Sequence, residues 1–351
     1  MDKNVIYKRL ILLTTLVAFI TIILGAYTRL SNAGLGCPDW PGCYGQLMVP
    51  DSEQEILAAN AAFPQTPVKK EKAWTEMIHR YVAGSLGLLI VAIAVMSWKR
   101  RKPPIFLPTL LVVIVMFQAI LGMWTVITLL KPLVVVAHLV FGFITLALLF
   151  CLNLQVRTDL THHNLSKHPK IYFYKITAGI GLVILMLQIM LGGWTSSNYA
   201  ALACTDLPTC QGQWFPNMDF DQAFSLEATN LEAKNLEEKN VGNAPVNYEG
   251  GVLNNEARTA IHFSHRLGAV ITLLYLLSLA VVLIKHSSNP LLPPLSRSVG
   301  LLIIGLVCTQ FTLGLSNVYF GLPLLIATSH NAIASLLLLS LVFLNYLLYQ
   351  N

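Results

Sequence analysis

Four histidines lie in strongly apolar segments, at corresponding places in two similar stretches of the sequence. They are His79 and His138 in the first stretch, and His265 and His330 in the second. One such histidine could be a hydrogen-bonded packing residue, but a duplicated pair favours ligands, because ionisable groups inside a membrane are costly. Imidazoles from two facing helices are what a six-coordinate heme iron requires, whereas copper or zinc normally recruits more ligands at one point. The histidines therefore predict two heme sites, one in each stretch.

A carboxylate accompanies only the first pair, because Glu76 precedes His79 by three residues and His262 stands at the corresponding place before His265. The spacing of three puts Glu76 and His79 on one helix face, about one turn apart. Beside a heme edge, a carboxylate can accept a proton or stabilise positive charge on a reacting carbon. The alternative is a helix N-terminal carboxylate favoured by the helix dipole. The difference predicts one catalytic and one supporting heme, with no role assigned to His262.

An arginine directly follows the first histidine of each pair, as Arg80 and Arg266. A guanidinium group at the water-facing end of a span could bind heme propionates, or it could simply extend toward the membrane surface. Small residues nearby could let a flat macrocycle approach the backbone, or could permit close helix packing. These glycines are Gly84, Gly87, Gly122, Gly142, Gly268 and Gly314.

Two cysteine-bounded loops, "LGCPDWPGCYGQ" at 35–46 and "LACTDLPTCQGQ" at 202–213, resemble each other at a constant offset of 167. Cys37 with Cys43, and Cys204 with Cys210, can each close a small ring. A reduced pair could bind metal instead, but one Cys-x5-Cys lacks the second ligand pair of a zinc site. We therefore predict two disulfides.

The elements that must carry these residues are membrane-spanning helices. The chain is 55% hydrophobic and only 11% charged, far below the roughly 25% typical of soluble domains. Apolar runs long enough to cross a bilayer predict an all-α integral membrane protein with eight spans. The spans are expected at about 10–29, 79–98, 105–129, 133–153, 172–195, 262–284, 298–319 and 323–349. Neither a cleavage site nor a transit peptide is evident, which favours a bacterial protein.

An internal repeat divides the chain into two four-helix units, residues 1–155 and 156–351. Gln118 to Gln310, Gly122 to Gly314 and His138 to His330 share one offset of 192. Since an even number of spans separates the copies, they have the same orientation, and a pseudo-two-fold axis along the membrane normal is expected. An acidic, Asn-rich insertion near 214–257 accounts for the changed offset and is expected to be poorly packed.

Basic residues predict the orientation, because cytoplasmic loops carry an excess of Lys and Arg. The side that holds both termini has 13 of the 23 basic residues but only two acids, Asp2 and Asp159. Both termini are therefore expected in the cytoplasm, and both cysteine loops on the periplasmic side, where disulfides persist. The net charge of +6 reflects this topology and does not indicate nucleic-acid binding.

The motifs "TRLSNAGLGCPDWPGC", "EMIHR", "AHLVFG", "SHRLGA" and "SHNAIA", taken together, resemble the heme A synthase family across all eight spans. The resemblance implies oxidation of the C8 methyl group of heme O to the formyl group of heme A, for terminal cytochrome oxidases. It implies a substrate heme flanked by His79 and His138, with Glu76 as the catalytic acid residue. It also implies a permanent heme b held by His265 and His330.

The family further implies a bacterial inner-membrane location and heme O synthase, the protoheme farnesyltransferase, as the delivery partner. Cys37 and Cys43 match the outer-loop pair that the family links to heme transfer or a redox role, while the second pair would be structural. The sequence names no electron acceptor. An alternative interpretation is a di-heme membrane cytochrome that only transfers electrons, which leaves Glu76 unexplained. A transporter with parallel repeats would leave the paired histidines unexplained.

Overall fold

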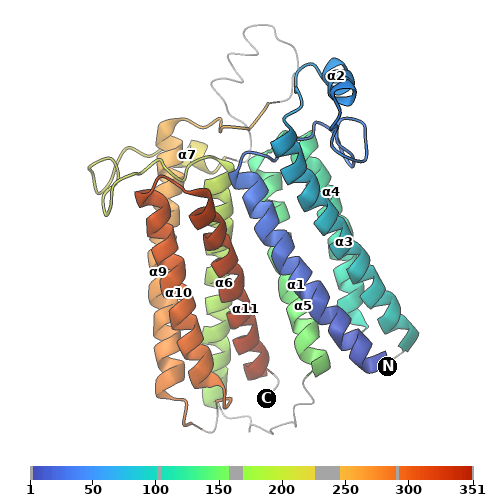
Figure 1. Cartoon of the computed structure of the whole chain (residues 1–351). Helices are drawn as coiled ribbons and strands as arrows, with labels where there is room; N and C mark the ends of the chain where they lie inside the picture. The colour runs from blue at the N-terminus through green and yellow to red at the C-terminus, as the bar shows by residue number, and fades with distance from the viewer. Residues whose placement is uncertain (1–2, 101–104, 158–168, 226–245, 290–291, 350–351) are drawn as a thin grey trace.

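The structure is a computed structural model that describes residues 3–100, 105–157, 169–225, 246–289 and 292–349 (Figure 1). Eight of its helices are long and apolar enough to cross a membrane, as the hydropathy predicted. They are α1 (Lys3–Leu30), α3 (Lys70–Arg100), α4 (Phe106–Ile127), α5 (Pro132–Arg157), α6 (Pro169–Ser197), α9 (Asn255–Lys285), α10 (Ser296–Tyr319) and α11 (Leu324–Tyr349). The chain is therefore a multi-pass membrane protein.

Both termini lie at one end of the bundle, as an even number of spans requires (Figure 1). The short helices α2 (Glu53–Ala62) and α7 (Phe220–Ala223) lie at the other end. A capping box begins α2, in which the Ser52 hydroxyl accepts from the Glu55 N–H and the Glu55 carboxylate accepts from the Ser52 N–H. The outer end of the protein is thus a folded layer on top of the membrane helices.

Three helices begin seven or more residues before the predicted spans, namely α1, at its end predicted to lie in the cytoplasm, and the two helices that carry His79 and His265. We expected the second span to begin at His79 and the sixth at 262, but α3 begins at Lys70 and α9 at Asn255. Charged residues in these first turns end the hydropathy signal, although helix formation continues where the outer loops pack on them. The Asn254 side chain caps α9 by accepting from the Ala257 N–H. His79 and His265 consequently lie well inside rigid helices.

Each half of the chain is a closed ring of four helices. In the first half α1 packs on α3, α3 on α4, α4 on α5 and α5 on α1. In the second half α6 packs on α9, α9 on α10, α10 on α11 and α11 on α6. The halves meet where α1 packs on α11 and α5 packs on both α6 and α11. Every packing pair within the first half therefore has its counterpart in the second.

The apolar core is divided in the same way. One buried cluster fills the first bundle around Ile90, Ile93 and Leu149, and a larger one fills the second bundle around Leu276 and Leu341. Two smaller clusters lie under the outer loops, one around the first disulfide and one around Ala257 and Ile261. Because each outer layer has its own core, the loops hold a defined position above each bundle.

The insertion near 214–257 is attached to the bundles on both sides of its residues 226–245, which lie outside the described part of the chain. At its beginning, the Trp194 indole N–H donates to the Ala223 carbonyl at 2.8 Å. At its end, the Tyr248 N–H donates to the Leu129 carbonyl at 3.0 Å. The flanks are therefore anchored to the bundles at Ala223 and Tyr248, although most of their described residues are exposed or partly buried, and the prediction of a poorly packed segment stays a prediction.

Candidate functional site

The histidines of each half come from diagonally opposite helices. His79 lies on α3 and His138 on α5, and both of these helices pack on α1 and α4. The two imidazoles are close enough to interact electrostatically, and the same is true of His265 and His330. Each pair therefore comes from two opposite helices of its own bundle, and joint binding of one heme by the two imidazoles stays a prediction.

A glycine of a neighbouring helix lies against every one of these four imidazoles. A methyl group on Gly25 of α1 would lie 3.0 Å from Cε1 of His79, and one on Gly192 of α6 would lie 3.3 Å from Cε1 of His265. Methyl groups on Gly122 and Gly314 would lie 3.5 and 3.3 Å from Cε1 of His138 and His330. The missing side chains let each ring sit between two helices.

Sequence reasoning found only half of these glycines. It named Gly122 and Gly314 but missed Gly25 and Gly192, although "ILGAYTR" and "MLGGWTS" are equivalent segments of the repeat. The other glycines that it named do not contact an imidazole. Gly142 and Gly268 pack on glutamine side chains, Gly87 approaches Val115, and Gly84 faces open space.

The imidazoles fit axial heme ligation. Nδ1 of His79, His138 and His330 is buried without a hydrogen-bond partner in the described part of the chain. Buried polar atoms are rarely left unpaired, so Nδ1 does not fix these three rings within the protein. Among the described residues there is also no group of three or more His, Cys, Asp or Glu side chains that could hold a metal ion. Pairs of imidazoles suit a porphyrin iron, whose other four ligands come from the macrocycle itself.

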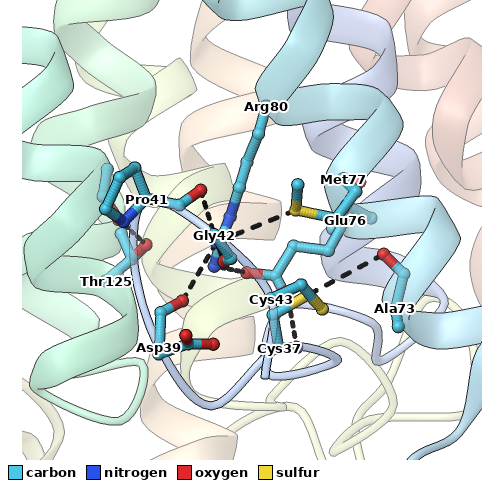
Figure 2. A network of polar contacts seen from close by, with 12 residues as sticks. Cys37, Asp39, Pro41, Gly42, Cys43, Ala73, Glu76, Met77, Arg80 and Thr125 are labelled. Carbon is cyan, nitrogen blue, oxygen red and sulfur yellow. Dashed lines mark hydrogen bonds and ion pairs between the residues drawn. A yellow bond between two sulfur atoms is a disulfide. The ribbon is translucent and has the colours of Figure 1, made fainter. Parts of the chain in front are cut away.

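Glu76 joins α3 to the first cysteine loop (Figure 2). Its side chain is buried, with 5% of its surface exposed. One carboxylate oxygen pairs with Nη2 of Arg80 at 2.6 Å, and the other accepts from the Cys37 N–H at 2.9 Å. The Arg80 guanidinium also donates to the carbonyls of Asp39 and Gly42. The carboxylate is therefore held rigidly, one helical turn before His79.

His262 makes the same connections in the second half. Its Nδ1 accepts from the Cys204 N–H at 3.1 Å, and its Nε2 lies 3.2 Å from Nε of Arg266. The Arg266 guanidinium donates to the carbonyls of Cys204, Asp206 and Thr209. His262, to which the sequence assigned no role, thus anchors the second loop. It can do so only because this loop folds back onto α9.

Both arginines therefore hold cysteine loops, which sequence reasoning missed. No sequence signal marks these contacts, because the arginines bind backbone carbonyls, which every loop has, and only the fold brings loop and helix together. Contacts of Arg80 and Arg266 with heme propionates remain a prediction.

The two loops have the same internal geometry. The predicted disulfides are present, Cys37–Cys43 and Cys204–Cys210. The Asp39 carboxylate accepts from the N–H groups of Tyr44 and Gly45, whose φ angles are 55° and 74°. This left-handed backbone is easily adopted by glycine, and the hydrogen bonds stabilise it at Tyr44.

The second loop repeats this turn with Asp206, Gln211 and Gly212. Hydrogen bonds from the Thr209 hydroxyl and from the N–H groups of Gly212 and Gln211 lower the pKa of the Asp206 carboxyl to about 2. In the first loop, burial and the negative charges of Asp39 and Glu76 raise the pKa of the Tyr44 phenol. In each loop, the Asp two places after the first cysteine is thus the residue that stabilises the turn after the second cysteine.

Comparison with known proteins matches most of the chain. The family described as cytochrome oxidase assembly protein (COX15-CtaA) matches residues 8–342. A heme A synthase of Shewanella oneidensis is 44% identical over 347 residues, which cover 97% of this chain and 96% of that protein. A heme A synthase of Halalkalibacterium halodurans is 25% identical over 351 residues, again 97% of this chain and 96% of the relative. One of Shouchella clausii is 29% identical over 227 residues, covering 63% of this chain and 68% of the relative.

The family match extends from the first turns of α1 into α11, so it includes both histidine pairs, both cysteine loops and Glu76. This chain belongs to the COX15-CtaA family of cytochrome oxidase assembly proteins.

Proposed function

We propose that this protein is a heme A synthase, an oxidoreductase that converts the C8 methyl group of heme O into the formyl group of heme A. The observation that carries the proposal is 44% identity to a heme A synthase along almost the entire chain. The two histidine pairs support it independently, because each pair carries imidazoles on two opposite helices of one bundle, as axial ligation of a porphyrin iron requires.

The two halves have different tasks in this proposal. Residues 1–155 take the substrate heme O between His79 and His138. Residues 156–351 hold a resident heme b between His265 and His330. The presence of a carboxylate at Glu76, where the second half has His262, supports the assignment of the reaction to the first half.

Glu76 is the catalytic residue of the proposal. The methyl group reaches the formyl level by two successive two-electron oxidations, which pass four electrons in total to an external acceptor. Each oxidation adds one oxygen atom, giving first an alcohol and then a geminal diol, and the diol loses one of the two oxygens as water to leave the aldehyde. A carboxylate held at both oxygens by Arg80 and the Cys37 N–H can stabilise positive charge on the reacting carbon without reorganising. Heme b, when bound, supplies a redox centre that can pass electrons onward.

Propionate binding is proposed for the outer ends of the bundles. Arg80 and Arg266 are candidates for propionate binding, because each guanidinium has N–H donors that do not bind the loop carbonyls. Arg258 is a further candidate, because its Nε is buried without a partner in the described part of the chain. It precedes His265 by seven residues, which places both side chains on one face of α9, about 10 Å apart along the axis.

The proposed setting is a bacterial inner membrane, with both termini in the cytoplasm and both cysteine loops in the periplasm. The matching helix pairs of the two rings support a pseudo-two-fold axis along the membrane normal. Heme O synthase is the proposed delivery partner, because it produces the farnesylated substrate within the same membrane.

Extraction and chromatography of bound hemes test the function. The purified protein, co-expressed with heme O synthase, is expected to contain heme b together with farnesylated, formyl-bearing heme A. His330→Ala should lose the low-spin heme b spectrum. A protein that carries only heme b would instead be a di-heme electron-transfer cytochrome, and a colourless protein would contradict both functions.

A further inference from the structure

Glutamine side chains contact both imidazoles of the second half. The Gln188 amide nitrogen lies 3.0 Å from Nδ1 of His265 and donates to the His265 carbonyl oxygen at 3.0 Å. The Gln310 amide nitrogen lies 3.1 Å from Nε2 of His330. Both rings therefore have a polar partner that restricts their rotation about χ2.

The imidazoles of the first half have no such partner among the described residues. Gln118, the counterpart of Gln310, donates to the backbone carbonyl of His138 at 3.0 Å and leaves the ring Nδ1 unpaired. The repeat offset of 167 makes Thr21 the counterpart of Gln188. The Thr21 hydroxyl donates to the Val17 carbonyl of its own helix at 2.7 Å, so His79 has no side-chain hydrogen bond.

The residue that packs on the Gln188 side chain also differs between the halves. A methyl group on Gly268 would lie 2.2 Å from the Gln188 side-chain oxygen, so a side chain at residue 268 would displace the amide from its present position. His79 and His265 are 186 residues apart, and the same offset makes Val82 the counterpart of Gly268. The second half thus combines a long side chain with a glycine, and the first half combines a short side chain with valine.

We infer that Gln188 is a positioning residue that orients His265 for the resident heme, and that its absence beside His79 makes the first site exchangeable. A histidine that binds metal usually donates its other ring N–H to an acceptor, which fixes the ring and raises its basicity. The Gln188 side-chain oxygen has no partner in the described part of the chain. Rotation of the amide therefore brings an acceptor to Nδ1 of His265 when the other ring nitrogen binds iron.

This inference rests on the proposed function, since a site that releases its heme product needs an axial histidine that can dissociate from the iron. Substrate and product must pass through the first half, whereas the second half keeps its heme. A free imidazole beside Gly25 can turn without breaking a hydrogen bond. An imidazole held by Gln188 cannot.

Heme transfer from the loaded, full-length protein to apomyoglobin tests the inference. The wild type is expected to release heme in two phases, and chromatography of the transferred heme assigns each phase. Gln188→Leu should speed the slow release of heme b by about tenfold or more, as losses of such outer partners usually do. It should also shift the heme b midpoint potential. Thr21→Val, which removes only an intrahelical hydrogen bond, is the matched control and should change neither quantity.

The reverse substitutions, made in the first half, provide a second test. Thr21→Gln combined with Val82→Gly rebuilds the amide contact beside His79, and it should slow release from the first half by about tenfold. If Gln188→Leu gives too little protein, Gln188→Glu keeps the size, and its stronger acceptor should lower the heme b potential. Unchanged release rates, potential and low-spin spectrum in the Gln188 variants would overturn the inference. A wild type without any bound heme would instead contradict the proposed function.

Discussion

Glu76 and His262 occupy equivalent positions and hold equivalent loops with different chemistry. Each accepts the N–H of the first loop cysteine, and each contacts the arginine four residues later. Anchoring the loop therefore does not require a carboxylate. What Glu76 adds is a negative charge in the first bundle alone, which is the property that a reaction at the substrate would use.

Glu76→His separates these two roles. The substituted imidazole can keep the contacts to Cys37 and Arg80, as His262 does with Cys204 and Arg266, so we expect normal folding and heme content. Heme A formation should fall by at least about a hundredfold, the scale of losing a positioned electrostatic group. Heme extraction after co-expression with heme O synthase measures both. Glu76→Ala, the control, should also loosen the loop. Full heme A yield in Glu76→His would remove the carboxylate from the mechanism.

At the scale of elements, each cysteine loop is a small folded unit fastened to one helix. A disulfide closes it, an aspartate binds two backbone N–H groups inside it, and an arginine from the helix binds its carbonyls. These contacts join the loop to the same helix that carries a heme-ligand candidate. Movement of the loop is therefore coupled to the outer turns of α3 or α9.

Acid is expected to loosen the second loop through Asp206. Its pKa is lowered from 3.8 to about 2, so the ionised carboxylate stabilises the folded loop. That stabilisation is complete above about pH 4 and is lost as the pH falls toward 2. Hydrogen exchange of the peptide 206–213, corrected for intrinsic rates, should show protection at pH 5 and its loss near pH 2. Asp206→Asn should abolish this pH dependence. An equal pH dependence in that variant would assign it to another group.

The whole molecule is joined at its outer end by contacts between the halves. Nη2 of Arg29 on α1 donates to the Ser196 carbonyl on α6 at 2.7 Å, and its guanidinium lies 4.2 Å from the centre of the Tyr199 ring. The Lys72–Glu249 ion pair, at 3.4 Å, connects α3 to the end of the second-half insertion. Such contacts complement the apolar packing of α1 on α11 and α5 on α6.

Arg29→Ala should destabilise the assembled protein by about 2 kcal/mol. The estimate combines a charged hydrogen bond with a cation–π contact in a partly buried setting. Thermal unfolding of the purified protein in detergent, followed by the loss of helical circular dichroism, measures the change. Lys72→Ala is the matched control, because a partly exposed ion pair contributes about 0–1 kcal/mol. Equal melting temperatures for Arg29→Ala and the wild type would show that the Arg29 contacts do not stabilise the joined halves.

Hydropathy, repeat offsets and short cysteine rings are local properties of the chain, and they were enough to predict the eight spans, the paired positions of the four histidines and both disulfides. Which glycine faces which imidazole could be seen only in the fold, since this depends on the rotation of each helix about its axis. The same holds for Arg80, Arg266 and His262, whose partners lie in loops that fold back across about 40 to 60 residues of chain. Hydropathy also placed the starts of α3 and α9 too late, because charged first turns are helical only where the outer layer packs on them.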